Sequence, residues 1–151
     1  VQELLDAGVT VGIGTDGAAS NNDLDVFDEL RDAAMVGKLE ADDAAAVAAP
    51  DVVRAATEGG AKLLGFDAGR IEAGALADLA VVDLRKPHLT PRHDLVSHLA
   101  YAVRGSDVRH TIVDGEVVVR DGELTTLDEA SVRREAQRRA EALVDRAKQI
   151  D

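Results

Sequence analysis

The residues best placed for chemistry lie near the start of the chain, where Asp16 follows a run of apolar residues and glycines. Residues 9–14 of this run are typical of a short buried strand that ends at Thr15. Asp16 is therefore expected at the C-terminal end of a strand. In a parallel α/β barrel that end of the strands carries the catalytic groups, and a carboxylate there can ligate a metal ion or accept a proton.

The side chains of this loop also have a purely structural interpretation. Asp-Gly is a common turn, because Asp tolerates the positive φ angle that such turns require. Ser20, Asn21 and Asn22 follow on the same loop. They could hydrogen-bond a substrate, but the same residue types cap loops and helices. The residue types alone leave both interpretations open.

Helices are expected on both sides of this loop. Residues 2–7 fit a helix that ends at Gly8, and apolar residues at helical spacing predict another helix from residue 26 onward. N-cap oxygens for the second helix are available on Asn22, Asp23 and Asp25. Such helices would cover the strand that delivers Asp16.

A third helix is predicted from Pro50, a residue suited to the first turn of a helix. Its inward-facing residues are expected to be Val52, Val53 and Ala56. Glycines at 59 and 60 are expected to interrupt this helix. A short continuation should then end at Gly65.

From residue 69 to 127 the pattern changes to short strands. The runs that predict strands are residues 79–84, 108–113 and 117–120. Asp114-Gly115 joins the last two and is the strongest short hairpin signal that a sequence offers. Asp121-Gly122 marks a second turn, after which residues 124–127 can pair again.

The end of the chain predicts one long helix over residues 128–150. Its apolar side chains fall along one face: Val132, Ala136, Ala140, Leu143, Ala147 and Ile150. Arginines and glutamates alternate over the rest of the helix, which is most simply a solvated face.

The chain resembles the amidohydrolase superfamily in the segment GTDGAASNNDLD (14–25) followed by FDELRDAA (27–34). These match the last strand, loop and helix of its deaminase and chlorohydrolase branch, and are most similar to 5-methylthioadenosine/S-adenosylhomocysteine deaminases. The resemblance continues through ATEGGAKLLGFD (56–67), GRIEAGALADLAVVDL (69–84) and VRHTIVDGEVVVRDGEL (108–124). It therefore spans nearly the whole chain.

The resemblance implies an α/β fold that is the C-terminal part of a TIM-barrel amidohydrolase. Residues 1–68 would be the end of the (β/α)8 barrel, with its last β/α unit and helices. Residues 69–127 would form half of a small composite β-sandwich, and residues 128–151 a C-terminal helix. Because the chain begins with Val1 inside an expected helix, we expect it to be a piece of a longer protein.

The activity implied by the resemblance is metal-dependent hydrolytic deamination of an adenosine-type nucleoside, most often with zinc. Asp16 would bind the metal and accept a proton from water, while Ser20, Asn21 and Asn22 could contact the substrate. Family members bind metal through an early His-x-His pair, a later His and an Asp. Only the Asp has a counterpart here, and a catalytic zinc usually needs three protein ligands, so we expect the 151 residues alone to be inactive.

The histidines of this chain are not expected to be metal ligands. His88, His93, His98 and His110 show neither His-x-His nor His-Glu-x-x-His spacing. His98 is the best of them, and a partly buried, hydrogen-bonded role is expected there.

Two rival functions remain open. One is a different amidohydrolase reaction: guanine or cytosine deamination, triazine dechlorination or cyclic amide hydrolysis. The other is non-enzymatic, with the sandwich half and the final helix acting only in assembly. A His-x-His strand in the upstream coding sequence would separate an enzyme from an assembly role.

Composition limits the partners and the environment. The net charge of −12 argues against nucleic acid, because phosphate contacts need a basic surface. We find no cysteine, no apolar run as long as a membrane span and no leader, which predicts a cytoplasmic protein. The resemblance implies a small-molecule substrate. The 29 acidic residues outnumber the 17 basic residues, which suggests adaptation to high salt. The resemblance also implies a homo-oligomer for the full-length protein.

Overall fold

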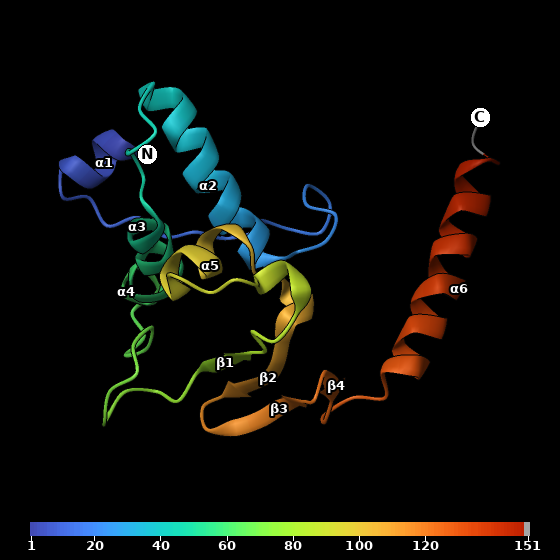
Figure 1. Cartoon of the computed structure of the whole chain (residues 1–151). Coiled ribbons are helices and arrows are strands. Elements are labelled where there is room, and N and C mark those ends of the chain that lie inside the picture. The colour runs from blue at the N-terminus through green and yellow to red at the C-terminus, as the bar shows by residue number, and fades with distance from the viewer. Residues whose placement is uncertain (150–151) are drawn as a thin grey trace.

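A group of helices packs above one end of a four-stranded sheet, and a long helix projects to the side (Figure 1). This computed structural model describes residues 1–149. The helical group contains α1 (Gln2–Asp6), α2 (Val26–Ala41), α3 (Ala49–Arg54), α4 (Gly60–Leu64) and α5 (Leu95–Tyr101). The strands are β1 (Leu79–Val82), β2 (Val108–Val113), β3 (Glu116–Arg120) and β4 (Glu123–Leu124), and the projecting helix is α6 (Glu129–Ala147).

The hydrophobic core lies among α2, α3 and α5. It is built from small and branched side chains: Leu30, Ala34, Ala46, Val47, Ala49, Val52 and Ala100. As predicted, α2 begins after Asp25, whose Oδ1 accepts a hydrogen bond from the Phe27 amide at 3.0 Å. Pro50 lies in the first turn of α3, and Val52 is buried, also as predicted. The local signals at Asp25 and Pro50 therefore predicted where α2 and α3 begin.

The predicted interruption at Gly59 and Gly60 is wrong, because the backbone stays helical through both residues. A π-helical turn, Ala55–Gly59, joins α3 directly to α4. Gly59 instead allows a close approach: a Cβ placed on it would lie 2.1 Å from the carbonyl oxygen of Val11. The helix ends where expected, at Gly65, which adopts the left-handed conformation with φ of 76°.

The predicted strand over residues 9–14 is also not formed as a strand. This segment runs beside the π-helical turn and α4 but has no ladder partner among residues 1–149. A strand is defined by hydrogen bonds to a neighbouring strand, and the described sheet lies elsewhere in the chain. The apolar side chains of this segment still face the helices, since Val11 and Ile13 are partly buried.

The sheet is antiparallel throughout and has the order β1-β2-β3-β4. The hairpin predicted at Asp114-Gly115 is confirmed, with φ angles of 48° and 80° at its two central residues. These positive angles suit a tight turn whose twist matches that of the strands. The second turn, at Asp121-Gly122, is confirmed as well, but β4 is short and ends at Leu124.

Helix α5 was not predicted from the sequence. It lies between β1 and β2 in the chain, yet it packs against α2 and α3. Asp94 caps it, because its Oδ1 accepts hydrogen bonds from the amides of Val96 and Ser97. The division of the chain at residues 68 and 127 stays a prediction.

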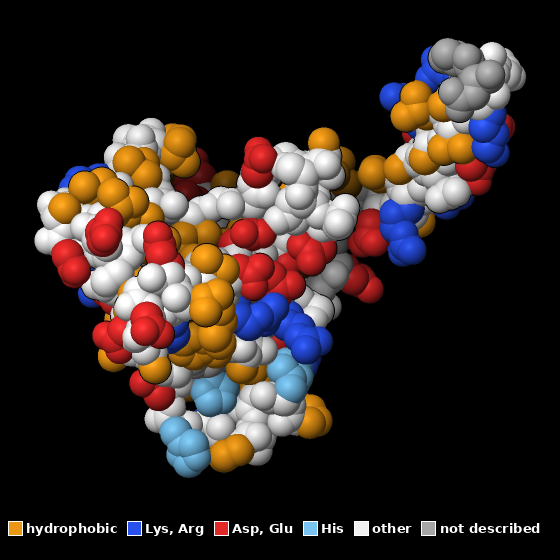
Figure 2. Space-filling view, turned by 90° about the horizontal axis from the view of Figure 1, so that it is seen from above, with side chains coloured by type: hydrophobic (Ala, Val, Ile, Leu, Met, Phe, Trp, Pro, Cys, Tyr) orange, Lys and Arg blue, Asp and Glu red, His pale blue; other side chains and the backbone are white. Residues whose placement is uncertain are grey.

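The long C-terminal helix was predicted over residues 128–150 and is found as α6, capped by Asp128. Residues 150 and 151, including Ile150 of the predicted apolar face, lie outside the described residues. None of the α6 side chains is buried, and its apolar residues line a helix that stands away from the rest of the molecule (Figures 1 and 2). No helix within residues 1–149 has the length and apolar character needed to cross a membrane.

Candidate metal and substrate site

Asp16 lies at the point where the segment of residues 9–15 turns into the following loop. Its backbone is left-handed, with φ of 59°, and its side chain is exposed. The hydroxyl of Ser20 donates a hydrogen bond to Asp16 Oδ2 at 2.7 Å. This bond, followed by one from the backbone of Gly17, lowers the pKa of Asp16 below its ordinary value. Asp16 is therefore a preoriented, ionised carboxylate.

The loop after Asp16 is held together mainly by its own polar groups. The amides of Ser20 and Asn21 both donate to the carbonyl oxygen of Gly17 at 3.0 Å. The Asn21 side chain closes the next turn, since its Oδ1 accepts from the Leu24 amide at 2.8 Å and its Nδ2 donates to the carboxylate of Glu29. This amide is engaged within the protein.

Of the three predicted substrate contacts, the structure therefore brings only Ser20 into contact with Asp16. Asn21 points to the start of α2 through Glu29, and the side chain of Asn22 is exposed. Asn22 is thus the more accessible of the two side-chain amides.

A second polar cluster surrounds Asp107, the buried charged residue of the described chain. Lys86 Nζ lies 2.9 Å from its Oδ1, His88 Nε2 lies 2.9 Å from its Oδ2, and the Arg104 amide donates to Oδ2 at 3.0 Å. Burial raises the pKa of Asp107, but the bonds with Lys86 and His88 outweigh it and lower the pKa to about 2. This cluster was not predicted from the sequence, because its members lie in separate turns, about 20 residues apart in the chain.

His88, His98 and His110 each contact other groups of the protein, and His93 is exposed. His98 is partly buried and its Nδ1 lies 2.9 Å from the carbonyl oxygen of Asp94, which confirms its predicted hydrogen-bonded role. The Nδ1 atom of His110 accepts a hydrogen bond from the Asp121 amide at 3.1 Å. Within residues 1–149, no group of three His, Cys, Asp or Glu side chains could hold a metal ion. Asp16 fits a metal site as one carboxylate ligand and not as a complete one.

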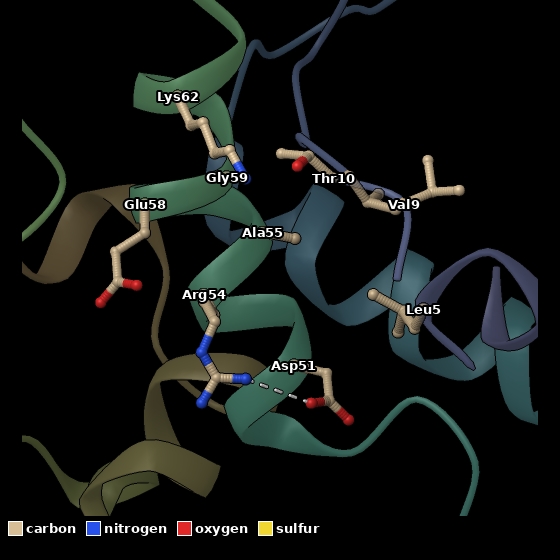
Figure 3. A pocket seen from close by; sticks show the side chains of 10 residues that line it. Leu5, Val9, Thr10, Asp51, Arg54, Ala55, Glu58, Gly59 and Lys62 are labelled. Carbon is tan, nitrogen blue, oxygen red and sulfur yellow. Dashed lines mark ion pairs between the residues drawn. The ribbon is translucent and has the colours of Figure 1, made fainter. Parts of the chain in front are cut away.

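A small cavity of about 220 Å³ lies between α1, residues 9–11 and the helix that runs from α3 to α4 (Figure 3). Its charged lining includes Asp51 and Arg54, which form an ion pair at 3.6 Å. Neither Asp16 nor Ser20 lines it. This cavity is therefore separate from the Asp16 loop.

Residues 1–118 match the Amidohydrolase family. The match covers well over half of the chain, so the chain belongs to the amidohydrolase family, as the resemblance of its motifs predicted. These residues include Asp16, its loop, the first two strands of the sheet and the start of the third.

Relatives of this chain are adenosine-related deaminases. It is 79% identical over 147 residues to the 5-methylthioadenosine/S-adenosylhomocysteine deaminase of Natronomonas pharaonis, covering 97% of this chain and 34% of that protein. It is 49% identical over 146 residues to the 5'-deoxyadenosine deaminase of Methanosarcina mazei, with coverage of 97% and 34%. The chain thus spans about a third of the length of these relatives.

The fold is similar to that of a solved zinc-containing enzyme. The crystal structure of an adenosine deaminase from Xanthomonas campestris with bound zinc superposes with a TM-score of 0.91 at 40% sequence identity. The superposition covers 94% of this chain and 33% of that one. Helices and sheet are therefore arranged here as in a much longer amidohydrolase.

Proposed function

We propose that the full-length protein containing this chain is a zinc-dependent hydrolase that deaminates an adenosine-type nucleoside, with 5-methylthioadenosine or S-adenosylhomocysteine as the substrate class. The observation that carries this proposal is the 79% identity to a 5-methylthioadenosine/S-adenosylhomocysteine deaminase across 97% of the chain. The zinc in the similar solved structure supports the choice of metal.

Asp16 is proposed as a metal ligand and proton acceptor. When bound, zinc supplies an activated water molecule as the nucleophile. The hydrogen bond from Ser20 orients the Asp16 carboxylate through Oδ2, so that the exposed carboxylate can meet the metal or accept a proton. A carboxylate is required for this role, because an amide cannot accept the proton at neutral pH.

The three loop residues then have different roles in the proposal. Ser20 orients Asp16, and Asn21 shapes the loop through Leu24 and Glu29. Asn22, which is exposed, is the candidate for direct hydrogen bonding to the nucleoside. The remaining ligands and the proton donor for the leaving ammonia would come from a part of the protein outside this chain.

The 151 residues alone are therefore expected to be inactive, and the full-length protein is proposed to act as a cytoplasmic homo-oligomer. The acidic composition supports a working environment of high salt, in which repulsion between carboxylates is screened.

The test is a deamination assay of the full-length protein with zinc. Candidate substrates are 5-methylthioadenosine, S-adenosylhomocysteine and 5'-deoxyadenosine, with guanine, cytosine, a chlorotriazine and a cyclic amide as comparisons. We expect ammonia release from the adenosine-type compounds at least about 100-fold faster, in kcat/KM, than from the others. Preference for 5'-deoxyadenosine, supported by the Methanosarcina mazei relative, would change the substrate within the class.

Two results would contradict the proposal. Preference for guanine, cytosine, a triazine or a cyclic amide would move the protein to a different amidohydrolase reaction. Absence of turnover with every compound would favour a role in assembly.

A further inference from the structure

The loop that carries Ser20 to Asn22 is tied to a distant part of the chain through Asp25. The two carboxylate oxygens of Asp25 bind different partners. Oδ1 caps α2 through the Phe27 amide, and Oδ2 accepts a hydrogen bond from the Gly105 amide at 2.7 Å. Asp25 and Gly105 are 80 residues apart in the chain, so this contact joins the loop to the turn that precedes β2.

The turn at Gly105 is itself firmly held. Arg104 donates its amide to the carboxylate of Asp107, and the Asp107 amide donates back to the Arg104 carbonyl at 2.9 Å. Lys86 pairs with the same carboxylate and also donates to the carbonyl oxygen of Ser106 at 2.7 Å. Asp107 is buried, so the turn offers a rigid amide to Asp25.

The contact also leaves little spare room. A Cβ placed on Gly105 would lie 3.1 Å from Oδ2 and 3.2 Å from Cγ of Asp25. Any side chain at position 105 would therefore press on the carboxylate. The backbone of Gly105 lies outside the left-handed region, so the absence of a side chain here serves the contact and not a turn conformation.

We propose that Asp25 is a positioning residue for residues 17–24, the loop that is proposed to contact the substrate. Its bond to Gly105 fixes the C-terminal end of residues 17–24, while Ser20 and Asp16 fix the other end. This inference rests on the proposed function for its effect on turnover. The buried Asp107 cluster holds the turn at Gly105 in place, and Asp25 ties the loop to this turn.

The test uses Asp25→Ser in the full-length protein, with Asp94→Ser as the matched control. Serine can still cap a helix, but it is too short to reach the Gly105 amide while capping. Asp94 caps α5 in the same way, and its side-chain hydrogen bonds go to residues of its own helix. We expect Asp25→Ser to raise KM about fivefold with kcat changed by less than about twofold, as for the loss of one hydrogen bond. Asp94→Ser should change neither.

A second variant and a second measurement distinguish the effect of the Asp25–Gly105 hydrogen bond from a folding defect and from a failure of the proposed function. Gly105→Ala disturbs the same hydrogen bond at its donor and should raise KM similarly. In the variant that carries both substitutions, the effect on KM should be less than additive. Hydrogen exchange of the amides of residues 17–24 should be faster in Asp25→Ser than in Asp94→Ser, whether or not a substrate is known.

Equal exchange rates in the two serine variants would overturn the proposal that Asp25 holds residues 17–24 in place. Faster exchange with an unchanged KM would overturn its role in positioning. If the unsubstituted protein deaminates no adenosine-type compound, the proposed function fails, and the exchange comparison alone decides the anchor.

Discussion

At the scale of single residues, the proposed metal site depends on the carboxylate of Asp16. It is exposed and ionised, and it is oriented by the hydroxyl of Ser20. Sequence reasoning left Asp16 open between a turn residue and a metal ligand on residue types alone, and favoured the ligand because of the resemblance to amidohydrolases. It could not show that Ser20 contacts Asp16 while Asn21 turns toward Glu29, since these choices depend on the conformation of the loop.

Substitution of Asp16 by Asn in the full-length protein should leave the fold intact and remove most of the activity. The exposed side chain contributes little to packing, whereas an amide is a poor metal ligand and cannot accept a proton. We expect kcat to fall by at least about 100-fold, with a melting temperature close to that of the original protein. Asp23→Asn, on the same loop, is the matched control. Activity within a few-fold of the original would remove the proposed role of Asp16.

At the scale of elements, Gly59 shows how the helix positions the segment that leads to Asp16. The carbonyl oxygen of Val11 lies where a Cβ of residue 59 would stand. Gly59→Ala in the full-length protein should therefore push the helix away from the Val11 backbone and lower the free energy of unfolding by about 2 kcal/mol. Gly60→Ala is the control: its nearest neighbour would be at 3.8 Å, so it should be neutral or stabilising by about 0.5 kcal/mol. Urea denaturation measures both, and equal stabilities would refute the close approach.

The cluster around Asp107 predicts a pH dependence of stability. The folded pKa of Asp107 is about 2, below its ordinary value of 3.8, so the contacts of its carboxylate with Lys86 and His88 stabilise the fold above about pH 4. This stabilisation is lost as the pH falls from 4 towards 2. We expect Asp107→Asn to lower the free energy of unfolding by about 2 kcal/mol at pH 7 and by much less near pH 2.

Denaturant titrations at several pH values measure this difference. Asp32→Asn, which removes an exposed carboxylate from α2, is the control and should have little effect at any pH. A loss of stability in Asp107→Asn that is the same at pH 7 and near pH 2 would contradict the role of the ion pairs.

The elements that the sequence predicted correctly are those with local signals. The Asp25 cap, Pro50 and the Asp114-Gly115 turn each act through nearby backbone groups. The failures involve contacts distant in the chain. Helix α5 is stabilised by packing on α2 and α3, and Gly59 is explained only by Val11, which lies 48 positions earlier in a different element. Residues 9–14 carry a strand pattern without a neighbouring strand in the described chain.

At the scale of the whole molecule, the acidic surface predicts a response to salt. Acidic side chains are spread over the face shown in Figure 2, and the chain carries a net charge of −12. Raising the ionic strength from about 0.1 M to about 1 M shortens the screening length from about 10 Å to about 3 Å. We therefore expect the melting temperature of the full-length protein to rise with potassium chloride. A melting temperature that is constant or falls would contradict the prediction of salt adaptation.

The overall arrangement also matches that of a longer amidohydrolase, although the described chain holds a single candidate metal ligand. The central claim is that Asp16 completes a metal site whose other ligands lie outside this chain. A crystal structure of the full-length protein with zinc tests it most directly. We expect a carboxylate oxygen of Asp16 to lie about 2.0–2.2 Å from the zinc ion. A zinc site without Asp16, or an Asp16 side chain that faces away from the metal, would contradict it.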